Sequence, residues 1–123
     1  MEQAKFRKEL ERIMPGYKWT VHRNYFQDSE YLEATGIQSS GFNRMFTLSV
    51  VRREKDGFPR YEVKSSGYGK KSSWLATRED VTLSRALRRL QTHYETTASI
   101  YSSHARGLQR GRSKPAQDES EGN

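Results

Sequence analysis

The stretch GYGKKSSW, residues 67–74, contains the residue types that can hold a phosphate group. Glycines let a backbone approach a ligand closely, lysines supply point charges, and an aromatic ring such as Tyr68 can stack on a base. A P-loop needs G-x-x-x-x-G-K-[ST], but Lys64 stands where the first glycine should be and Lys71 where the hydroxyl should be. The stretch is therefore not a P-loop. It either contacts a phosphate backbone or forms a turn in which Lys70 and Lys71 are solvated.

The sequence shows no cluster of residues that would catalyse a reaction or hold a metal. His22, His93 and His104 fall on a predicted strand, a predicted helix and its end, without i, i+4 spacing, and the chain has no cysteine. No nucleophile elbow surrounds any of the serines. The sequence therefore predicts a protein that is not an enzyme and that has no cofactor and no bound metal.

Positive charge is concentrated in one part of the chain. The formal net charge is +7, and residues 52–76 hold seven Lys and Arg against three Asp and Glu, an excess of +4. A patch of this kind attracts nucleic acid or an acidic protein surface, although it can also be a solvated face that aids solubility. The candidate binding residues are Arg52, Arg53, Lys55, Arg60, Lys64, Tyr68, Lys70, Lys71, Arg85, Arg88 and Arg89.

Hydrophobic periodicity gives the elements that must position these residues. Apolar residues at helical spacing before Pro15-Gly16 predict a first helix in residues 2–14, and strict alternation predicts a strand over 17–23. The next connection is predicted to form a short helical turn over 28–35 and a loop over 36–41. Two alternating runs around the turn signal Asp56-Gly57 then predict a β-hairpin.

The last helix is predicted to begin at Thr77, which is followed by acidic residues as an N-cap would be. Its apolar stripe contains Leu83, Ala86, Leu87, Leu90, Tyr94, Ala98 and Tyr101. Trp74 fits either the core beneath this helix or a contact with a ligand. Residues 1–105 are expected to form a single α+β domain, and residues 106–123, which have almost nothing to bury, a disordered polar tail.

The resulting order is α-β-β-β-α, which predicts a two-layer sandwich with a three-stranded antiparallel sheet and both helices on one face. The other face of the sheet is predicted to be open and polar. It would carry Lys18, Thr20, His22, Thr47, Ser49, Arg60, Glu62 and Lys64.

This order is similar to that of the double-stranded-RNA-binding domain, whose last helix begins with a glycine-containing turn and a lysine pair. Gly67, Gly69, Lys70 and Lys71 stand at the corresponding place. The cap at Thr77 would put the lysines before the helix, and GIQSSGF replaces the family's Gly-Pro-x-His loop. The resemblance is one of topology, and no residue role follows from it.

The chain of 123 residues has no apolar run long enough for a membrane span and begins with charged residues, so a cytoplasmic protein is expected. The first functional hypothesis is a small binding protein that contacts nucleic acid, or a complex that handles nucleic acid, through the hairpin at 46–67 and the loop at 67–74. The alternative is an accessory protein of a phage or mobile element, similar in character to inhibitors of CRISPR effectors, that binds a defence nuclease directly. The sequence leaves the oligomeric state open.

Overall fold

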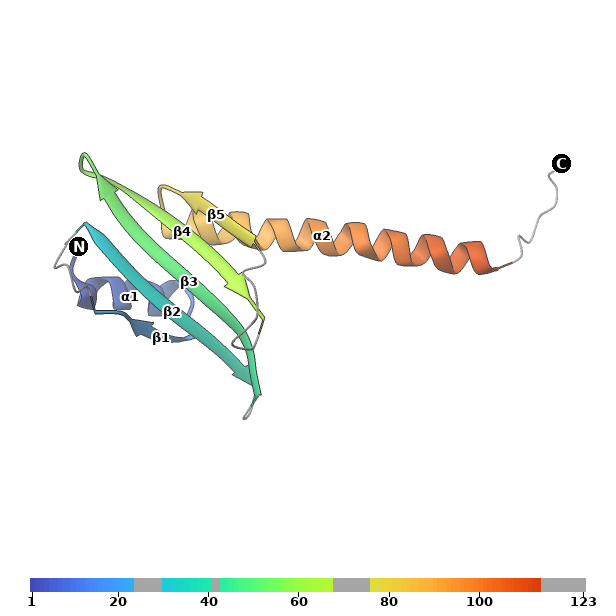
Figure 1. The fold of residues 1–123 in the computed structure, drawn as a ribbon, viewed down its shortest axis with the longest axis horizontal. Helices are drawn as coiled ribbons and strands as arrows, with labels where there is room; N and C mark the ends of the chain where they lie inside the picture. The colour runs from blue at the N-terminus through green and yellow to red at the C-terminus, as the bar shows by residue number, and fades with distance from the viewer. Residues whose placement is uncertain (24–29, 41–42, 68–75, 114–123) are drawn as a thin grey trace. The chain divides into compact units, whose positions relative to one another are not determined.

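A computed structural model describes residues 1–23, 30–40, 43–67 and 76–113, with only the backbone for 43–45. The elements are α1 (Gln3–Ile13), β1 (Lys18–Val21), β2 (Tyr31–Ser40), β3 (Asn43–Lys55), β4 (Phe58–Ser66), β5 (Ala76–Asp80) and α2 (Leu83–Arg112) (Figure 1). The chain divides into two units, Met1–Leu90 and Gln91–Asn123, and α2 crosses their boundary. No helix in the described ranges is long and apolar enough to cross a membrane.

The strands form one antiparallel sheet in the order β1-β2-β3-β4-β5, so each strand pairs with its neighbour in the chain. The mixed α+β class is as predicted, but the sheet has five strands where the sequence predicted three. The order also differs from that of the double-stranded-RNA-binding domain. The β3–β4 hairpin is confirmed, and Asp56 (φ 55°) and Gly57 (φ 81°) both have positive φ. Two such residues suit the tight turns that connect twisted antiparallel strands.

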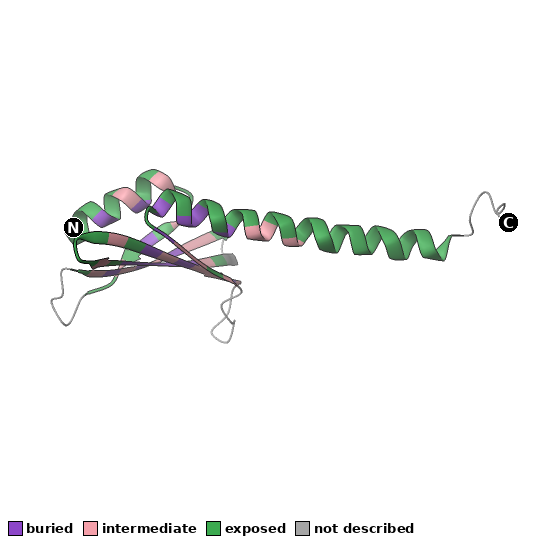
Figure 2. Cartoon of the chain, turned by 90° about the horizontal axis from the view of Figure 1, so that it is seen from above, coloured by how far each residue is buried: buried purple, intermediate pink, exposed green. Residues whose placement is uncertain are grey.

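Both helices contact side chains on the same face of the sheet. Tyr61 of β4 pairs directly with Asp80 of β5, and directly paired residues share a face. The Tyr61 hydroxyl donates to Glu9 Oε1 of α1 at 3.0 Å, and the Asp80 carboxylate forms ion pairs with Arg85 and Arg89 of α2. Figure 2 shows buried positions, in purple, on α1 and on the first part of α2. We refer to this side of the sheet as the Tyr61 face and to the opposite side as the Arg60 face.

The hydrophobic core lies on the Tyr61 face. Its largest fully buried side chains are Phe6 and Leu10 of α1, Val50 and Val63 of the hairpin, and Leu83 of α2. Val50 and Val63 are direct partners in the register, as the alternation of the two strands predicted. Each such side chain stabilises the fold by about 1.5–3 kcal/mol through the apolar surface that it removes from water.

The segment predicted as a helical turn and a loop is instead strand β2. Its inward positions are Leu32, Ala34 and Gly36, all buried, and the two small residues hid the alternation. Gly36 is required because the Trp19 ring lies across it: a Cβ on Gly36 would stand 2.8–2.9 Å from three ring atoms. The indole Nε1 donates to the Met14 carbonyl at 3.1 Å, which holds the ring in this position.

The predicted helix start at Thr77 is wrong, because Thr77 lies in strand β5 opposite Lys64. Helix α2 begins at Leu83, and the Thr82 Oγ1 accepts a hydrogen bond from the Arg85 backbone N–H at 3.2 Å. The sequence ATRED of β5 has alanine as its single apolar residue, and Asp80 is the one residue of this strand that is buried. Polar composition at an edge strand explains why the sequence did not indicate this strand.

Helix α2 buries the first part of its predicted stripe, namely Leu83, Ala86, Leu87 and Leu90. Tyr94 is half-buried, whereas Ala98 and Tyr101 are exposed. The helix continues to Arg112, so residues 106–112, which composition assigned to a disordered tail, are helical. Pro115, which cannot continue a helix, is the first strong stop signal in this part of the sequence. Residues 114–123 lie outside the described part of the chain.

Candidate functional site

Arg52 does not belong to a binding surface, because it is buried. Its residue exposure is 7%, and it lies on the Tyr61 face in direct pairing with Tyr61. Arg52 Nε donates to the Tyr61 hydroxyl at 3.0 Å, and Nη1 donates to Glu54 Oε2 at 2.9 Å. The sequence contained a signal for this placement, since Arg52 continues the alternation of Leu48 and Val50 into the core.

Hydrogen-bond partners keep the buried guanidinium of Arg52 protonated. Burial lowers the pKa of the Arg52 guanidinium, but the hydrogen bonds to Tyr61 and Glu54 outweigh that effect and leave the pKa raised. Burial is also the main reason that the pKa of Tyr61 is raised, and Glu9 adds to it. The four side chains form one continuous polar chain from Glu54 to Glu9, which is structural.

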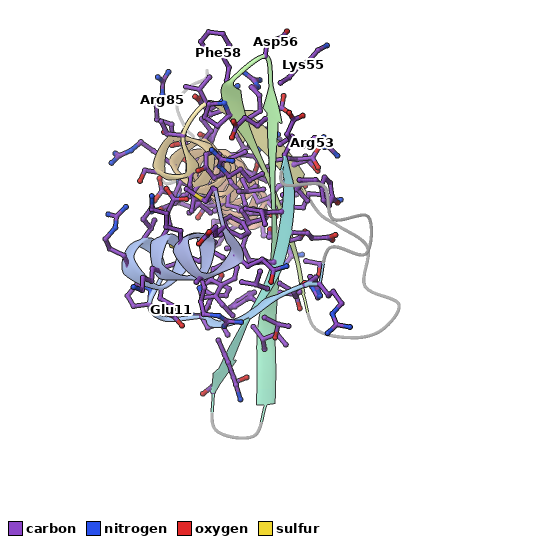
Figure 3. All side chains as sticks on the ribbon, turned by 90° about the vertical axis from the view of Figure 1, so that its left-hand side faces the viewer. Glu11, Arg53, Lys55, Asp56, Phe58 and Arg85 are labelled. Atoms are coloured by element: carbon purple, nitrogen blue, oxygen red, sulfur yellow. The ribbon has the colours of Figure 1, made fainter. Side chains whose placement is uncertain are left out.

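The arginines of α2 do not join the cations of the hairpin. Arg85 Nε lies 3.3 Å from Asp80 Oδ1, and Arg89 Nη1 lies 3.5 Å from Asp80 Oδ2. Figure 3 shows Arg85 on the side of the helices, whereas Arg53 and Lys55 point to the other side of the sheet. Arg88 is exposed on the same helix. The predicted patch is therefore divided between two sides of the molecule.

The carboxylate of Asp80 is stabilised in its charged form. It accepts a hydrogen bond from the Val81 backbone N–H at 2.6 Å, and this contact, with the two α2 arginines, holds the pKa of Asp80 below its ordinary value. The two arginines consequently act as partners of an anion that anchors β5 to α2.

Two predicted cations of the Arg60 face are less available than the sequence suggested. Arg60 Nη2 donates to Glu79 Oε1 at 2.8 Å, although both side chains remain about half exposed. Lys64 is half-buried and pairs with Thr77 in the register. Glu62 and Glu79 are direct partners beside them, which reduces the positive potential of this part of the face.

Arg53 and Lys55 are the exposed cations that the hairpin presents on the Arg60 face. The Arg53 guanidinium carbon lies 5.8 Å from the centre of the Tyr31 ring, which is a cation–π contact. In the described part of the chain, neither Arg53 nor Lys55 forms an ion pair with a carboxylate. Tyr31, Arg53 and Arg60 are directly paired in one row across β2, β3 and β4. We name the set of Tyr31, Arg53, Lys55 and Arg60 the hairpin site.

Tyr31 and Phe58 are the members of this region that sequence reasoning did not select. Tyr31 lay in the segment predicted as helical, so its place beside Arg53 was hidden. Its pKa is raised, mainly by burial and then by Glu33, to which its hydroxyl donates at 3.1 Å. Phe58 is 72% exposed at the tip of the hairpin, where it pairs directly with Lys55 in the register. An aromatic residue directly after Asp56-Gly57 was the available signal.

The centre of the Arg60 face is less open than predicted. Ser49, Val51 and Ser66 point to this face by alternation, yet all three are buried. Exposed side chains are therefore found toward the ends of the strands, and the hairpin site is one such end. Tyr68, Lys70, Lys71 and Trp74, which the sequence proposed for a loop beside it, lie outside the described residues.

The groups that the hairpin site presents are cationic and aromatic. Among the side chains that the structure describes, no three of His, Asp and Glu lie together as a metal site would require. His22 Nε2 is hydrogen-bonded to Thr35 Oγ1 at 2.7 Å, away from the hairpin site. What the site provides is exposed positive charge next to one aromatic ring.

Comparisons of this chain with models of protein families, with curated proteins and with solved structures found no match.

Proposed function

We propose that this chain is a non-enzymatic binding protein whose hairpin site contacts single-stranded nucleic acid. The observation that carries the proposal is the exposed Arg53 beside the Tyr31 ring, with the exposed Lys55 two residues further along β3. Proteins that bind single strands combine cations that follow the backbone with aromatic rings on which bases stack. The hairpin site contains both cations and an aromatic ring: Tyr31 and Arg53 lie in one row across the sheet, and Lys55 lies nearer the turn.

The spacing of the site supports this role. Neighbouring strands lie about 4.8 Å apart, so the row Tyr31–Arg53–Arg60 spans roughly 10 Å across three strands. The planar guanidinium of Arg53 can bind a phosphate with two parallel hydrogen bonds while it stays over an aromatic ring. Lys55 adds a point charge one step further along the same face. Arg60 joins when a phosphate competes with its exposed partner Glu79.

The rest of the sheet favours contact at the hairpin site. We infer that both helices cover the Tyr61 face, which leaves the Arg60 face for a ligand. Because Ser49 and Val51 are buried at the centre of that face, a ligand would meet exposed cations mainly at the end of the hairpin. An unpaired base can reach the Tyr31 ring there, whereas bases in a duplex are already stacked on one another.

Fluorescence anisotropy with a labelled single-stranded oligonucleotide tests the proposal at two salt concentrations. Two or three phosphate contacts predict a slope of log affinity against log salt of about −1.5 to −2, from roughly −0.7 per contact on single strands. The double reversal Arg53→Glu with Lys55→Glu should abolish most of this binding. Tyr31→Leu, which keeps apolar volume but removes the aromatic ring, should weaken single-strand binding about fivefold or more.

The matched control is Lys8→Glu with Arg88→Glu, which changes the net charge equally on the two helices. Both residues are exposed. The proposal predicts that this control keeps most of the affinity, because its charges lie away from the hairpin site. Equal losses in the two double variants would mean that only the overall charge matters. Absence of binding at low salt would overturn the proposal.

A protein partner, such as the defence nuclease that an accessory inhibitor would bind, is the second candidate function. The observation that favours it is Phe58, since a largely exposed aromatic side chain at a hairpin tip is a typical anchor of protein interfaces. Phe58→Ala should then abolish co-purification with the partner and leave oligonucleotide affinity unchanged. This candidate would be excluded if Phe58→Ala left co-purification unchanged while Arg53→Glu abolished oligonucleotide binding.

A further inference from the structure

We propose that arginine side chains of the two helices close the edges of the sheet against pairing with a second copy of this chain. The strand order leaves β1 and β5 as the outermost strands (Figure 1). The outer edge of a sheet presents backbone N–H and C=O groups on which another strand can pair. Arg7 of α1 reaches one of these edges and Arg89 of α2 reaches the other. Neither arginine belongs to the hairpin site, so the proposal is independent of the proposed function.

The register shows which backbone groups of β5 face outward. In an antiparallel sheet, alternate residues of a strand form their backbone hydrogen bonds with opposite neighbours. The Glu54 N–H donates to the Glu30 carbonyl at 2.9 Å, so even-numbered residues of β2 and β3 bond to each other in this part of the sheet. Followed through the β3–β4 and β4–β5 pairings, the alternation directs the backbone groups of Arg78 to β4 and those of Thr77 and Glu79 away from the sheet.

Arginine side chains occupy both of these outward carbonyls of β5. Arg89 Nη1 donates to the Glu79 carbonyl at 3.2 Å, and Arg78 Nη1 donates to the Thr77 carbonyl at 2.6 Å. The Arg89 guanidinium also lies 3.5 Å from Asp80 Oδ2, which holds it beside the strand. A second strand would therefore have to displace two guanidinium groups before its own N–H groups could reach these carbonyls.

The edge formed by β1 has the same kind of contact. The His22 N–H donates to the Glu33 carbonyl of β2 at 2.9 Å, so Trp19, three residues earlier, directs its backbone groups outward. Arg7 Nη1 donates to the Trp19 carbonyl at 3.0 Å. Each helix thus sends one arginine to an outward carbonyl of an edge strand. Water could satisfy either carbonyl, so the recurrence of the contact at both edges is what carries the proposal.

Like charges add to the protection of β5. An antiparallel pair of β5 strands that uses the outward groups of both Thr77 and Glu79 sets Thr77 of one copy opposite Glu79 of the other. The same register sets Arg78 opposite Arg78, and like charges directly opposite each other destabilise a strand pair. Arg78 pairs directly with the buried Val63, so it lies on the Tyr61 face. Charged side chains that point inward at an edge strand are one means by which sheets avoid edge-to-edge pairing.

Disulfide trapping in the full chain tests the β5 edge, because the chain has no native cysteine. Arg78→Cys brings two thiols opposite each other in that register, at a Cα separation of about 4.5 Å, which a disulfide can span. Arg78→Cys with Arg89→Ala should cross-link about tenfold faster or more than Arg78→Cys with Arg85→Ala. Arg85 is the matched control, because it carries the same charge and pairs with Asp80 but donates to none of the described strand carbonyls. Equal cross-linking rates would overturn the proposal.

Sedimentation velocity of the full chain gives a second test, which concerns the β1 edge and does not depend on Arg89. Arg7→Ala is compared with Arg12→Ala, which removes another exposed arginine of α1, at the same concentration. Arg7→Ala should shift the chain toward a larger species, while circular dichroism still shows the folded sheet. Arg7→Ala combined with Arg78→Ala and Arg89→Ala opens both edges and should give assemblies larger than that species, since two different contacts can then alternate without closing. Sedimentation of Arg7→Ala equal to that of Arg12→Ala would overturn the proposal for β1.

Discussion

Replacement of Gly36 by alanine should destabilise the fold through one specific contact. The new Cβ would lie 2.8 Å from Cζ3 and 2.9 Å from Cε3 and Cη2 of the Trp19 ring. Unbonded carbon atoms normally lie about 3.5–4.0 Å apart, so the ring has to move by roughly 0.6–1 Å. Trp19 is only 6% exposed and its Nε1 is hydrogen-bonded to Met14, so the ring cannot swing freely into solvent.

The size of the effect follows from three contributions. Overpacking of a close-packed core costs about 1–3 kcal/mol. Loss or weakening of the indole hydrogen bond adds about 1 kcal/mol. Replacing a glycine lowers the conformational entropy of the unfolded chain, which stabilises the fold by about 0.4–1 kcal/mol. We therefore expect Gly36→Ala to lower the free energy of unfolding by about 1–3 kcal/mol.

Urea unfolding followed by circular dichroism measures this change. The matched control is Gly16→Ala, whose Cβ would meet only the flexible end of Gln38 at 3.9 Å and should change the stability by less than about 0.5 kcal/mol. Trp19→Leu should be less harmful in the Gly36→Ala background than in the native chain, with a coupling energy of about 1–2 kcal/mol. Equal unfolding midpoints for Gly36→Ala and the native chain would refute the reasoning.

Two further predictions concern the junction of β5 and α2. Thr82→Ala should cost about 1 kcal/mol because it removes the N-cap, whereas Thr77→Ala should cost less than about 0.5 kcal/mol in the same urea titration; a larger loss at Thr77 would contradict the observed helix start. Asp80→Asn should destabilise the protein at neutral pH, since the Val81 backbone N–H and the α2 arginines lower the pKa of Asp80 in the folded state. That stabilisation is complete above the ordinary value of 3.8 and disappears as the pH falls through the lower folded pKa. The unfolding midpoints of the native chain and of Asp80→Asn should therefore converge in acid. A separation that stayed constant with pH would contradict the assignment.

The parts of the fold that sequence predicted well are those with large apolar side chains in regular spacing. Phe6 and Leu10 placed α1, and the alternation of the hairpin placed Val50 opposite Val63, with Asp56-Gly57 as the turn. These signals are strong because burial of a large side chain dominates the local free energy.

The missed strands lack such signals. In β2 the inward positions include the small residues Ala34 and Gly36, and at Gly36 the Trp19 ring already occupies the space that a side chain would take. In β5 the inward position of Asp80 is stabilised by arginines that follow in the next helix. Both arrangements depend on partners elsewhere in the fold, which local propensity does not contain.

The sequence predicted positive charge in this region but not which residues present it at the surface. Charge counting treated Arg52 and Arg53 as equal, although neighbouring residues of a strand point to opposite faces. Arg52 is buried with Tyr61, and Arg53 is exposed beside Tyr31. Applying the alternation to charged residues as well as apolar ones separates these two arginines from the sequence alone.

The meander order of the sheet has a consequence for how the chain folds. Each strand closes on its predecessor through a connection short in sequence, so each pairing forfeits little loop entropy and the sheet can grow outward from the β3–β4 hairpin. The hydrogen bond between Glu9 and Tyr61 bridges 52 residues, so we expect it to form late, when the first helix docks on strands already joined. We therefore expect the unfolding rate to depend on the contact between α1 and the sheet. The folding rate should depend on the two-residue turn between β3 and β4.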